Sequence, residues 1–266
     1  MKSSSIVPGE DPDFPFLGEY DRYSFPDPME AKHDSIIAWG GNLSPGMLLS
    51  AYEQGLFPWY NEDDPILWHS PDPRFVIFPR TLHISASMKK LLKHRRYSIK
   101  ADKDFPAVIR ACSAKERPGQ DGTWLSKEMI AAYIEMHRLG WAHSAEAYDS
   151  FESDDSIESA TSGEQRLVGG CYGIRLGNFF FGESMFSLKP NASKAAFLSL
   201  AQFLFNDGVR LIDCQQHTNH MENLGGVEIS RKEFLVMLYK EMARRMATDG
   251  DKADRRGNWE GLINSD

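Results

Sequence analysis

Apolar side chains recur with helical spacing in five segments of the chain, and shorter apolar runs lie between them. Helices are predicted over residues 42–55, 83–96, 125–140, 191–208 and 230–245. Their starts carry capping signals, since Ser44 and Ser85 are good N-cap residues and Ser230 forms a capping box with Glu233. The helix over 191–208 is apolar on most sides, which predicts that it is buried.

Strand patterns fall between these helices from residue 75 onward. Strands are predicted at 75–78, 143–149 and 209–213, and residues 167–187 indicate a hairpin with its turn at 176–178. Helices interleaved with a sheet built largely from hairpins are typical of an α+β fold.

The chain divides by composition into a small N-terminal part and a larger second part. Residues 1–30 are rich in Pro, Asp and Ser, which predicts an extended arm anchored by Phe14, Phe16 and Phe25, and 31–72 indicates a small loop-rich unit. We therefore expect an arm and small domain in 1–72, a main domain in 73–246 with an acidic insertion at 150–166, and a disordered tail in 247–266.

Composition narrows the class of protein. The chain of 266 residues is 41% hydrophobic and 26% charged, as globular proteins are, and its apolar runs fall far short of the roughly 20 residues that a membrane span needs. The first residues lack the apolar core of a signal peptide, and three cysteines do not suit a disulfide framework. We expect a cytoplasmic protein, a monomer without membrane contact.

The distribution of charge changes what the net charge implies. A formal net charge of −8 argues against a nucleic-acid partner. However, the acidic residues concentrate in 152–165 and the N-terminal arm, whereas the predicted helix at 83–96 and its flank are basic. The cations of that segment are Lys89, Lys90, Lys93, Arg95, Arg96 and Lys100. A phosphate backbone remains a candidate partner for this segment.

Candidate chemistry gathers in "LIDCQQHTNHMENLGG", residues 211–226, where polar side chains follow the apolar end of a strand. Cys214, His217 and His220 have a spacing that zinc accepts, but no second Cys or His cluster completes four ligands. The alternative for the histidines is that they cap or line a surface loop. A metal site is therefore not expected.

The strand end offers two further interpretations. A nucleophilic Cys214 is disfavoured because the adjacent Asp213 raises the pKa of a thiol. In an extended segment Asp213 and Gln215 share one face and Cys214 takes the other. Glu183, set among apolar residues in "FFFGESMFS", is a third polar candidate. These groups either form a site or a buried polar network that joins two strands.

Aromatic residues are abundant beside the basic helix. Single-stranded RNA binding uses such aromatics because bases stack on them, whereas for any one residue core packing is the simpler explanation. The residues in question are Trp59, Trp68, Trp124, Phe180, Phe181 and Phe186.

Seven segments together resemble the leucyl/phenylalanyl-tRNA–protein transferase family, in the family's order and from about residue 35 to about residue 235. They are "GGNLSPGMLLSAYEQGLFPW", "PILWHSPDPRFVI", "HISASMKK", "GTWLS", "GESMFS", "NASKAAF" and "LIDCQQHTNHMENLGG". The resemblance implies transfer of Leu or Phe, with Met as a further candidate donor, from aminoacyl-tRNA to the N-terminal α-amino group of proteins that begin with Arg or Lys. The product is marked for degradation by the N-degron route.

The resemblance also implies a fold and a site. The fold has a small N-terminal domain and a C-terminal domain of the acetyltransferase superfamily (GNAT-like), and no cofactor or metal is used. The catalytic residues carried over are Asp213, Gln215 and Glu183. Residues expected at the aminoacyl pocket and the 3′-adenosine are Trp59, Trp124, Phe181, Met185 and Ser184. Contacts with the tRNA backbone are expected from Lys89, Lys90, Lys93, Arg95 and Arg96.

Two features depart from the family pattern. The acidic stretch 152–165 is longer than the family's compact turn, and His69 stands where relatives often carry an aromatic residue. Two rival functions remain open at this point: a tRNA-binding module without catalysis, and a metal-dependent hydrolase built on Cys214, His217 and His220.

Overall fold

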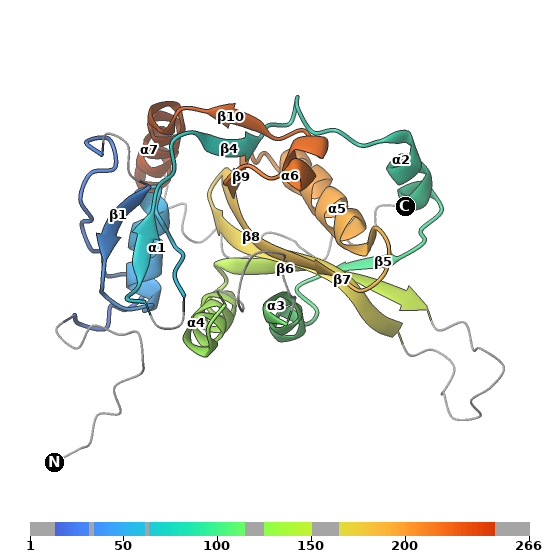
Figure 1. The fold of residues 1–266 in the computed structure, drawn as a ribbon, viewed down its shortest axis with the longest axis horizontal. Coiled ribbons are helices and arrows are strands. Elements are labelled where there is room, and N and C mark those ends of the chain that lie inside the picture. Colours follow the sequence, from blue (N-terminus) through green and yellow to red (C-terminus); the bar gives the residue numbers. More distant parts are fainter. Residues whose placement is uncertain (1–13, 32–34, 62–63, 115–124, 151–164, 248–266) are drawn as a thin grey trace, which may run out of the picture.

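A computed structural model describes residues 14–31, 35–61, 64–114, 125–150 and 165–247. Within them the largest element is a seven-stranded sheet with the strand order β10-β4-β9-β8-β7-β6-β5 (Figure 1). In that order the strands are Val227–Ile229, Arg74–Ile77, Leu211–Gln215, Phe179–Ser187, Gln165–Leu176, Ala142–Ser150 and Ser98–Ala101. Neighbours pair antiparallel except β8 and β9, which are parallel. The fold is mixed α/β with a sheet-rich second part.

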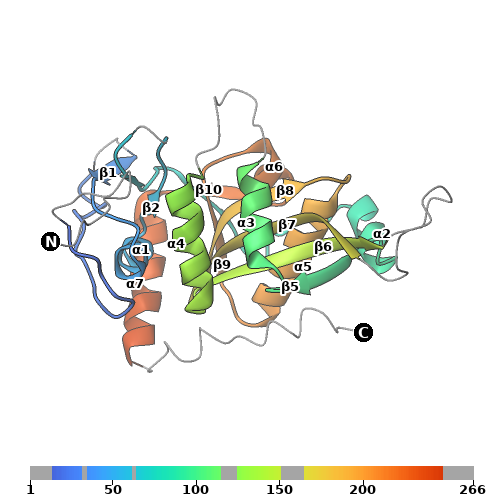
Figure 2. The same cartoon turned by 90° about the horizontal axis from the view of Figure 1, so that it is seen from below.

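Helices cover both faces of this sheet (Figures 1 and 2). Helices α3 (Phe105–Ser113) and α4 (Lys127–Arg138) lie on one face, and α5 (Ala192–Asn206) with the short α6 (Asn219–Asn223) lies on the other. The buried side chains of α5 include Phe197, Leu198 and Leu204, so the prediction of a buried helix is confirmed. Helix α2 (Ala86–Lys93) lies at the β5 end of the sheet.

The N-terminal part contains a second, smaller sheet. Strands β1 (Ile36–Trp39), β3 (Leu67–His69) and β2 (Phe57–Pro58) pair in that order, and α1 (Pro45–Glu53) packs beside them and against α7 (Arg231–Ala247). This unit is therefore more regular than the predicted loop. Strands of four, three and two residues are too short for an alternating pattern to show in the sequence.

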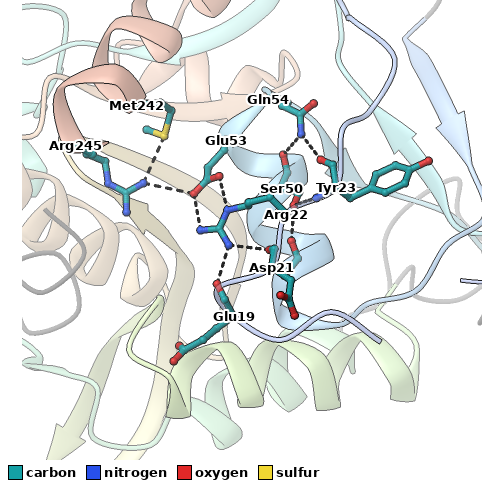
Figure 3. Close-up of polar contacts among 10 residues, drawn as sticks. Glu19, Asp21, Arg22, Tyr23, Ser50, Glu53, Gln54, Met242 and Arg245 are labelled. Atoms are coloured by element: carbon teal, nitrogen blue, oxygen red, sulfur yellow. Dashed lines mark hydrogen bonds and ion pairs between the residues drawn. The ribbon is translucent and has the colours of Figure 1, made fainter. Parts of the chain in front are cut away.

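The segment 14–31 runs along α1 and is fastened to it by side chains (Figure 3). Arg22 donates from Nε and Nη2 to the two carboxylate oxygens of Glu53, at 2.7 and 3.0 Å. The amide of Gln54 donates to the carbonyl of Tyr23 at 2.8 Å and to that of Ser50 at 2.8 Å. An extended arm draped on the body is thus confirmed for the described residues.

The predicted aromatic anchors of this arm are not equivalent. Phe25 is buried against Trp68, and Phe14 packs partly buried on the same core. Phe16 is 72% exposed, so its prediction as an anchor is wrong. Residues 1–13 lie outside the described part of the chain.

The five predicted helices are confirmed: four lie within the predicted bounds, whereas α7 continues past residue 245 to Ala247. Their caps are mostly as expected. Ser85 accepts a hydrogen bond from the amide of Met88, and Ser230 and Glu233 form the capping box. Ser44 stands at the N-cap of α1, but its hydroxyl accepts from the amide of Leu17 and does not cap the helix. The arm has taken the acceptor that the helix would otherwise use.

Several short elements went unpredicted, namely α3, α6, β5 and β10. Helix α3 did carry a signal, because Asp104 caps it through the amide of Ala107 and a proline occupies its first turn. The strand predicted at 209–213 begins instead at Leu211. The acidic insertion falls mostly on 151–164 and the tail on 248–266, both outside the described residues.

Candidate functional site

A β-bulge aims Glu183 out of strand β8. In the pairing of β7 with β8, Tyr172 faces Ser184 and Gly173 faces Gly182, which leaves Glu183 as the extra residue. A bulge bends the strand and redirects side chains, and bulges are frequent beside active sites. The carboxylate of Glu183 consequently reaches the space between the sheet and α1.

Three neutral donors surround this carboxylate. Tyr52 of α1 donates to Oε1 at 2.7 Å, Tyr133 of α4 donates to Oε2 at 3.2 Å, and the amide of Gln215 donates to Oε1 at 3.1 Å. The two tyrosine hydroxyls also lie within hydrogen-bonding distance of each other, and because each carries one hydrogen, this contact competes with donation to the ionised carboxylate. Burial raises the pKa of both tyrosines well above the ordinary value, so both stay protonated as donors at neutral pH.

The pKa of Glu183 is raised to about 7, and burial is the main cause. Hydrogen bonds from Tyr52, Tyr133 and Gln215 lower this pKa, while the charge of the nearby Asp213 raises it further. A carboxyl group that titrates near neutral pH can accept and return a proton under physiological conditions.

Asp213 is fully buried and paired. Its two carboxylate oxygens accept from Nε and Nη2 of Arg74 at 2.9 and 2.6 Å, and Oδ1 also accepts from the backbone amide of Gln215 at 2.8 Å. Arg74 is itself fully buried, and its guanidinium lies over the rings of Phe57 and Phe234. Asp213 therefore holds the end of β9 in place and lines neither of the two cavities described below.

The predicted alternation of side chains along β9 fails at its last residue. Gln215 has φ 66°, in the left-handed region, and the pairing with β4 shifts at the same place. Cys214 was predicted to point away from the site, but it lines both cavities together with Gln215, so that prediction is wrong. A strand end that turns out of the extended conformation no longer obeys a period of two.

The surroundings of Cys214 nevertheless keep its thiol protonated. Burial raises its pKa well above the ordinary value, and the charge of Asp213 raises it further. The predicted direction of the shift is confirmed, although burial contributes more than Asp213 does. A protonated thiol is a poor nucleophile, so Cys214 serves as an apolar wall.

Two cavities meet at Glu183. The larger cavity, of about 500 Å³, has mainly apolar walls. The smaller cavity, of about 170 Å³, is lined on one side by β2 and by Trp59, which follows it. Apolar residues of the larger cavity include Phe180, Met185, Phe197, Ile212 and Met221. The smaller one is lined by Phe57, Pro58 and Trp59. Both share Glu183, Cys214, Gln215, Gln216 and Thr218.

The predicted pocket residues fall into three groups. Met185 and Ser184 line the larger cavity and Trp59 lines the smaller one. Phe181 does not reach a cavity, because it points into the core with its ring centroid 5.1 Å from that of Tyr52, so its assignment to the pocket is wrong. Its neighbour Phe180 lines the larger cavity instead. Trp124 lies outside the described residues.

His69, the departure from the family pattern, packs as an aromatic residue would. Its ring lies stacked on Phe57 with centroids 5.9 Å apart, and it lies beside Trp59 at 5.5 Å. Burial lowers the pKa of His69, which favours the neutral ring. The neutral imidazole therefore supports the aromatic wall of the smaller cavity.

Sequence reasoning missed the groups that surround Glu183. No role was predicted from the sequence for Tyr52, Tyr133 or Arg74. A buried carboxylate requires donors, and that requirement was the available signal. Which tyrosines supply them is a matter of tertiary contact, because Tyr52 is 131 residues from Glu183 in the sequence.

The basic residues of α2 lie on the surface. Lys89, Lys90 and Lys93 are exposed, and Arg96 pairs with Asp149 at 2.7 Å while remaining half exposed. Arg95 is also exposed. Figures 1 and 2 both show α2 and the small sheet at opposite ends of the molecule, with the large sheet between them.

The proposed zinc ligands do not form a site. Across the described ranges, no three His, Cys, Asp or Glu side chains form a group that could hold a metal ion. His217 instead contacts Glu222 at 3.2 Å and packs on the ring of Phe75. The described helices also include none that is long and apolar enough to cross a membrane.

Two family models match successive segments of the chain, and both carry the name of one family. A family model described as leucyl/phenylalanyl-tRNA protein transferase matches residues 76–239, and the model of its N-terminal domain matches residues 41–72. Among solved structures, "The structure of L-PGS from Bacillus licheniformis" superposes with a TM-score of 0.36 and 15% identity over 56% of this chain and 48% of that chain. That likeness is too low to support a conclusion.

Curated relatives carry the same name as the family models. A leucyl/phenylalanyl-tRNA–protein transferase of Anaeromyxobacter sp. (strain Fw109-5) is 47% identical over 89% of this chain and 92% of its own length. That of Pseudomonas entomophila (strain L48) is 48% identical over 84% of this chain and 92% of its own length. At this identity and coverage, the chain belongs to the leucyl/phenylalanyl-tRNA–protein transferase family.

Proposed function

We propose that this protein transfers Leu or Phe from aminoacyl-tRNA to the N-terminal α-amino group of an acceptor protein. The observation that carries the proposal is the meeting of an apolar and an aromatic-walled cavity at one titratable carboxylate, Glu183. The aminoacylated 3′ end of Leu-tRNA or Phe-tRNA has parts that match these cavities. They are an apolar side chain and an adenosine, joined by one ester. The relatives' names describe the same reaction.

The larger cavity is assigned to the side chain of the donor amino acid. Its walls are apolar, through residues such as Phe180, Phe197 and Ile212, and its volume of about 500 Å³ suits a small ligand. Apolar pockets discriminate by only about 1–3 kcal/mol per methylene, so Leu, Phe and Met are all expected donors. Met185 and Ser184 contribute to the same pocket.

The smaller cavity is assigned to the 3′-adenosine. Trp59 and Phe57 offer ring faces there, and bases stack on such faces. The assignment of Trp124 to the same adenosine rests on the family resemblance. With these two placements, the ester lies at the shared wall beside Glu183 and Gln215.

In the proposed reaction the acceptor amine attacks the ester carbonyl carbon. A C–N bond forms, the bond between the carbonyl carbon and the ribose oxygen breaks, and the amine loses one proton to Glu183. The same proton then passes to the leaving ribose oxygen. A base with a pKa near the working pH is the most effective for such a transfer, and the pKa of Glu183 is about 7.

Gln215 and Asp213 have different parts in this proposal. The amide of Gln215 touches Glu183 and lines both cavities, so it can orient the amine and the ester. Asp213 is a positioning residue, since it binds the backbone amide of Gln215 and is neutralised by Arg74. Asp213 is thereby excluded from recognising the cation of an acceptor.

Little further chemistry is required, because an aminoacyl ester is already activated. Holding amine and ester in attack geometry can supply about 7–11 kcal/mol of the barrier. The free α-amino group titrates at about 8, so a weak base suffices to remove its proton. No cofactor or metal has a part in the proposed reaction.

The finer points of the assignment rest on the family resemblance. They are the exposed cations of α2 as the site of tRNA backbone contact, acceptors that begin with Arg or Lys, marking for N-degron degradation in the cytoplasm, and an acetyltransferase-like (GNAT-like) main domain. The parallel pairing of β8 with β9 in the described sheet supports an arrangement in which the middle of β8 and the end of β9 meet at one site.

One assay tests the proposed function. The protein is incubated with Phe-tRNA that carries labelled Phe, and with two peptides that differ only at their first residue, Arg or Asp. Label on the Arg peptide alone is expected. Binding of Phe-tRNA without transfer would support the non-catalytic module, and equal labelling of both peptides would contradict the acceptor assignment.

A further inference from the structure

We propose that the face of the small sheet beside Trp59 is a stacking surface for the unpaired nucleotides that precede the 3′-adenosine of the donor tRNA. Its outermost residue is Trp39, for which the family resemblance implies no role. The proposal rests on the proposed function, since it takes Trp59 as a contact of the adenosine.

Strand pairing brings Trp39 onto the same face as the cavity wall. Trp39 faces Leu67 and Ile36 faces His69, with a bulge between them in β1. Ile36 and Trp39 are three residues apart and would lie on opposite faces of a regular strand. The extra residue of the bulge restores both to one face.

The same face continues across β2 to the cavity. Phe57 faces His69, and the amide of Trp59 donates to the carbonyl of Leu67 at 3.0 Å, which places Trp59 opposite Leu67. Trp39, Leu67 and Trp59 therefore form a row across the three strands. At the usual spacing of strands, the two tryptophan Cα atoms lie about 10 Å apart.

Exposure distinguishes this face from the other. Trp39 is 76% exposed, whereas Trp68, which faces the opposite way, is 1% exposed and packs on Phe25. Ile36 is exposed as well. The exposed Trp39 and Ile36 thus lie on the same face as Trp59, which lines the smaller cavity, and exposed apolar side chains beside a cavity favour a binding surface.

The chemistry and position of the row favour nucleotides as its occupant. Nucleotides that precede the adenosine are covalently joined to it and must leave the smaller cavity across an adjacent surface. Bases of any sequence stack on an indole, which suits an enzyme that accepts more than one tRNA. An acceptor polypeptide crossing the same face is the competing occupant, and the experiment below separates the two.

The test compares donors of increasing length in the Trp39→Ala, Trp39→Phe and Phe16→Ala variants. The donors are phenylalanyl-adenosine, the same amino acid on the trinucleotide CCA, and Phe-tRNA. Phe16 is a matched control because it is 72% exposed but belongs to the N-terminal arm. Stacking one base is worth enough that Trp39→Ala should lower kcat/KM about 5- to 100-fold with the two longer donors.

With phenylalanyl-adenosine as the donor, kcat/KM of Trp39→Ala should equal the wild-type value. Trp39→Phe should retain most activity with every donor. Equal losses with all three donors, or a raised KM for the acceptor peptide, would overturn the proposal in favour of a polypeptide surface. No loss with any donor would also overturn it. If the wild-type protein transfers from no donor, the proposed function fails instead, and binding of uncharged CCA to the same variants still tests the stacking surface.

Discussion

The ionisation of Glu183 is the residue-scale feature on which the proposed reaction depends. Its folded-state pKa of about 7 lies above the ordinary value of 4.5, so the folded protein binds this proton more tightly than the unfolded chain does. The contribution of this group to stability is present below pH 4.5 and is lost as the pH rises to about 7. Ionisation of Glu183 in the folded protein thereby costs about 3 kcal/mol.

The hydrogen bond from Tyr52 lowers the pKa of Glu183 and so opposes the effect of burial. The tyrosine hydroxyl donates to the carboxylate at 2.7 Å and stabilises the charged form, so Tyr52→Phe should raise the pKa of Glu183 further. The acidic limb of the transfer rate against pH should then move to higher pH. Tyr60→Phe is the matched control, because Tyr60 is also a buried tyrosine but interacts with Ser126. An unmoved limb in Tyr52→Phe would show that Glu183 does not govern the rate.

At the scale of elements, a bulge within β8 and the irregular end of β9 make the site. The sequence predicted β8, β9 and the helices around them, because their apolar patterns are long enough to show a period. It did not predict the bulge at Glu183 or the left-handed Gln215, since both depend on how neighbouring strands pair. Glu183 and Gln215 were correctly brought together. The orientations of Asp213, Cys214 and Phe181 were predicted wrongly, because they depend on these irregular pairings.

The buried pair of Arg74 and Asp213 joins β4 to β9, and its removal should show in stability. Asp213→Asn or Arg74→Met alone leaves one buried charge without a partner, which costs about 3–5 kcal/mol. The double variant should lose clearly less than the sum of the two single losses. Urea unfolding of the three variants gives these free energies. Losses that add within about 0.5 kcal/mol would mean that the two side chains do not act as a pair.

At the scale of the whole molecule, the site lies between two candidate tRNA contacts. Helix α2, which carries the cations, lies at one end of the large sheet and the small sheet at the other, and β8 and β9, which carry Glu183 and Gln215, lie between them (Figure 1). The basic helix was predicted from its sequence alone. The small sheet was not, because its strands are shorter than any recognisable pattern.

The α2 helix should contribute to tRNA binding in a salt-dependent manner. Replacing Lys89, Lys90 and Lys93 by Ala should weaken binding of Phe-tRNA and flatten the plot of log affinity against log salt, because each phosphate contact releases counterions. Replacing the exposed Lys127, Lys232 and Lys240 of α4 and α7 is the control with the same change in charge. Equal slopes in both triple variants would place the tRNA backbone elsewhere.

Single-turnover transfer from pre-bound Phe-tRNA, followed against pH in the wild-type protein and in Glu183→Gln, tests the central claim most directly. The wild-type rate should rise with pH through two overlapping steps, one at an apparent pKa of about 7 from Glu183 and one near pH 8 from the acceptor amine. Glu183→Gln should bind Phe-tRNA with wild-type affinity and transfer about 10²- to 10⁴-fold more slowly. Only the titration of the acceptor amine near pH 8 should remain in its profile. A Glu183→Gln protein that transfers at the wild-type rate, with the limb near pH 7 unchanged, would contradict the account.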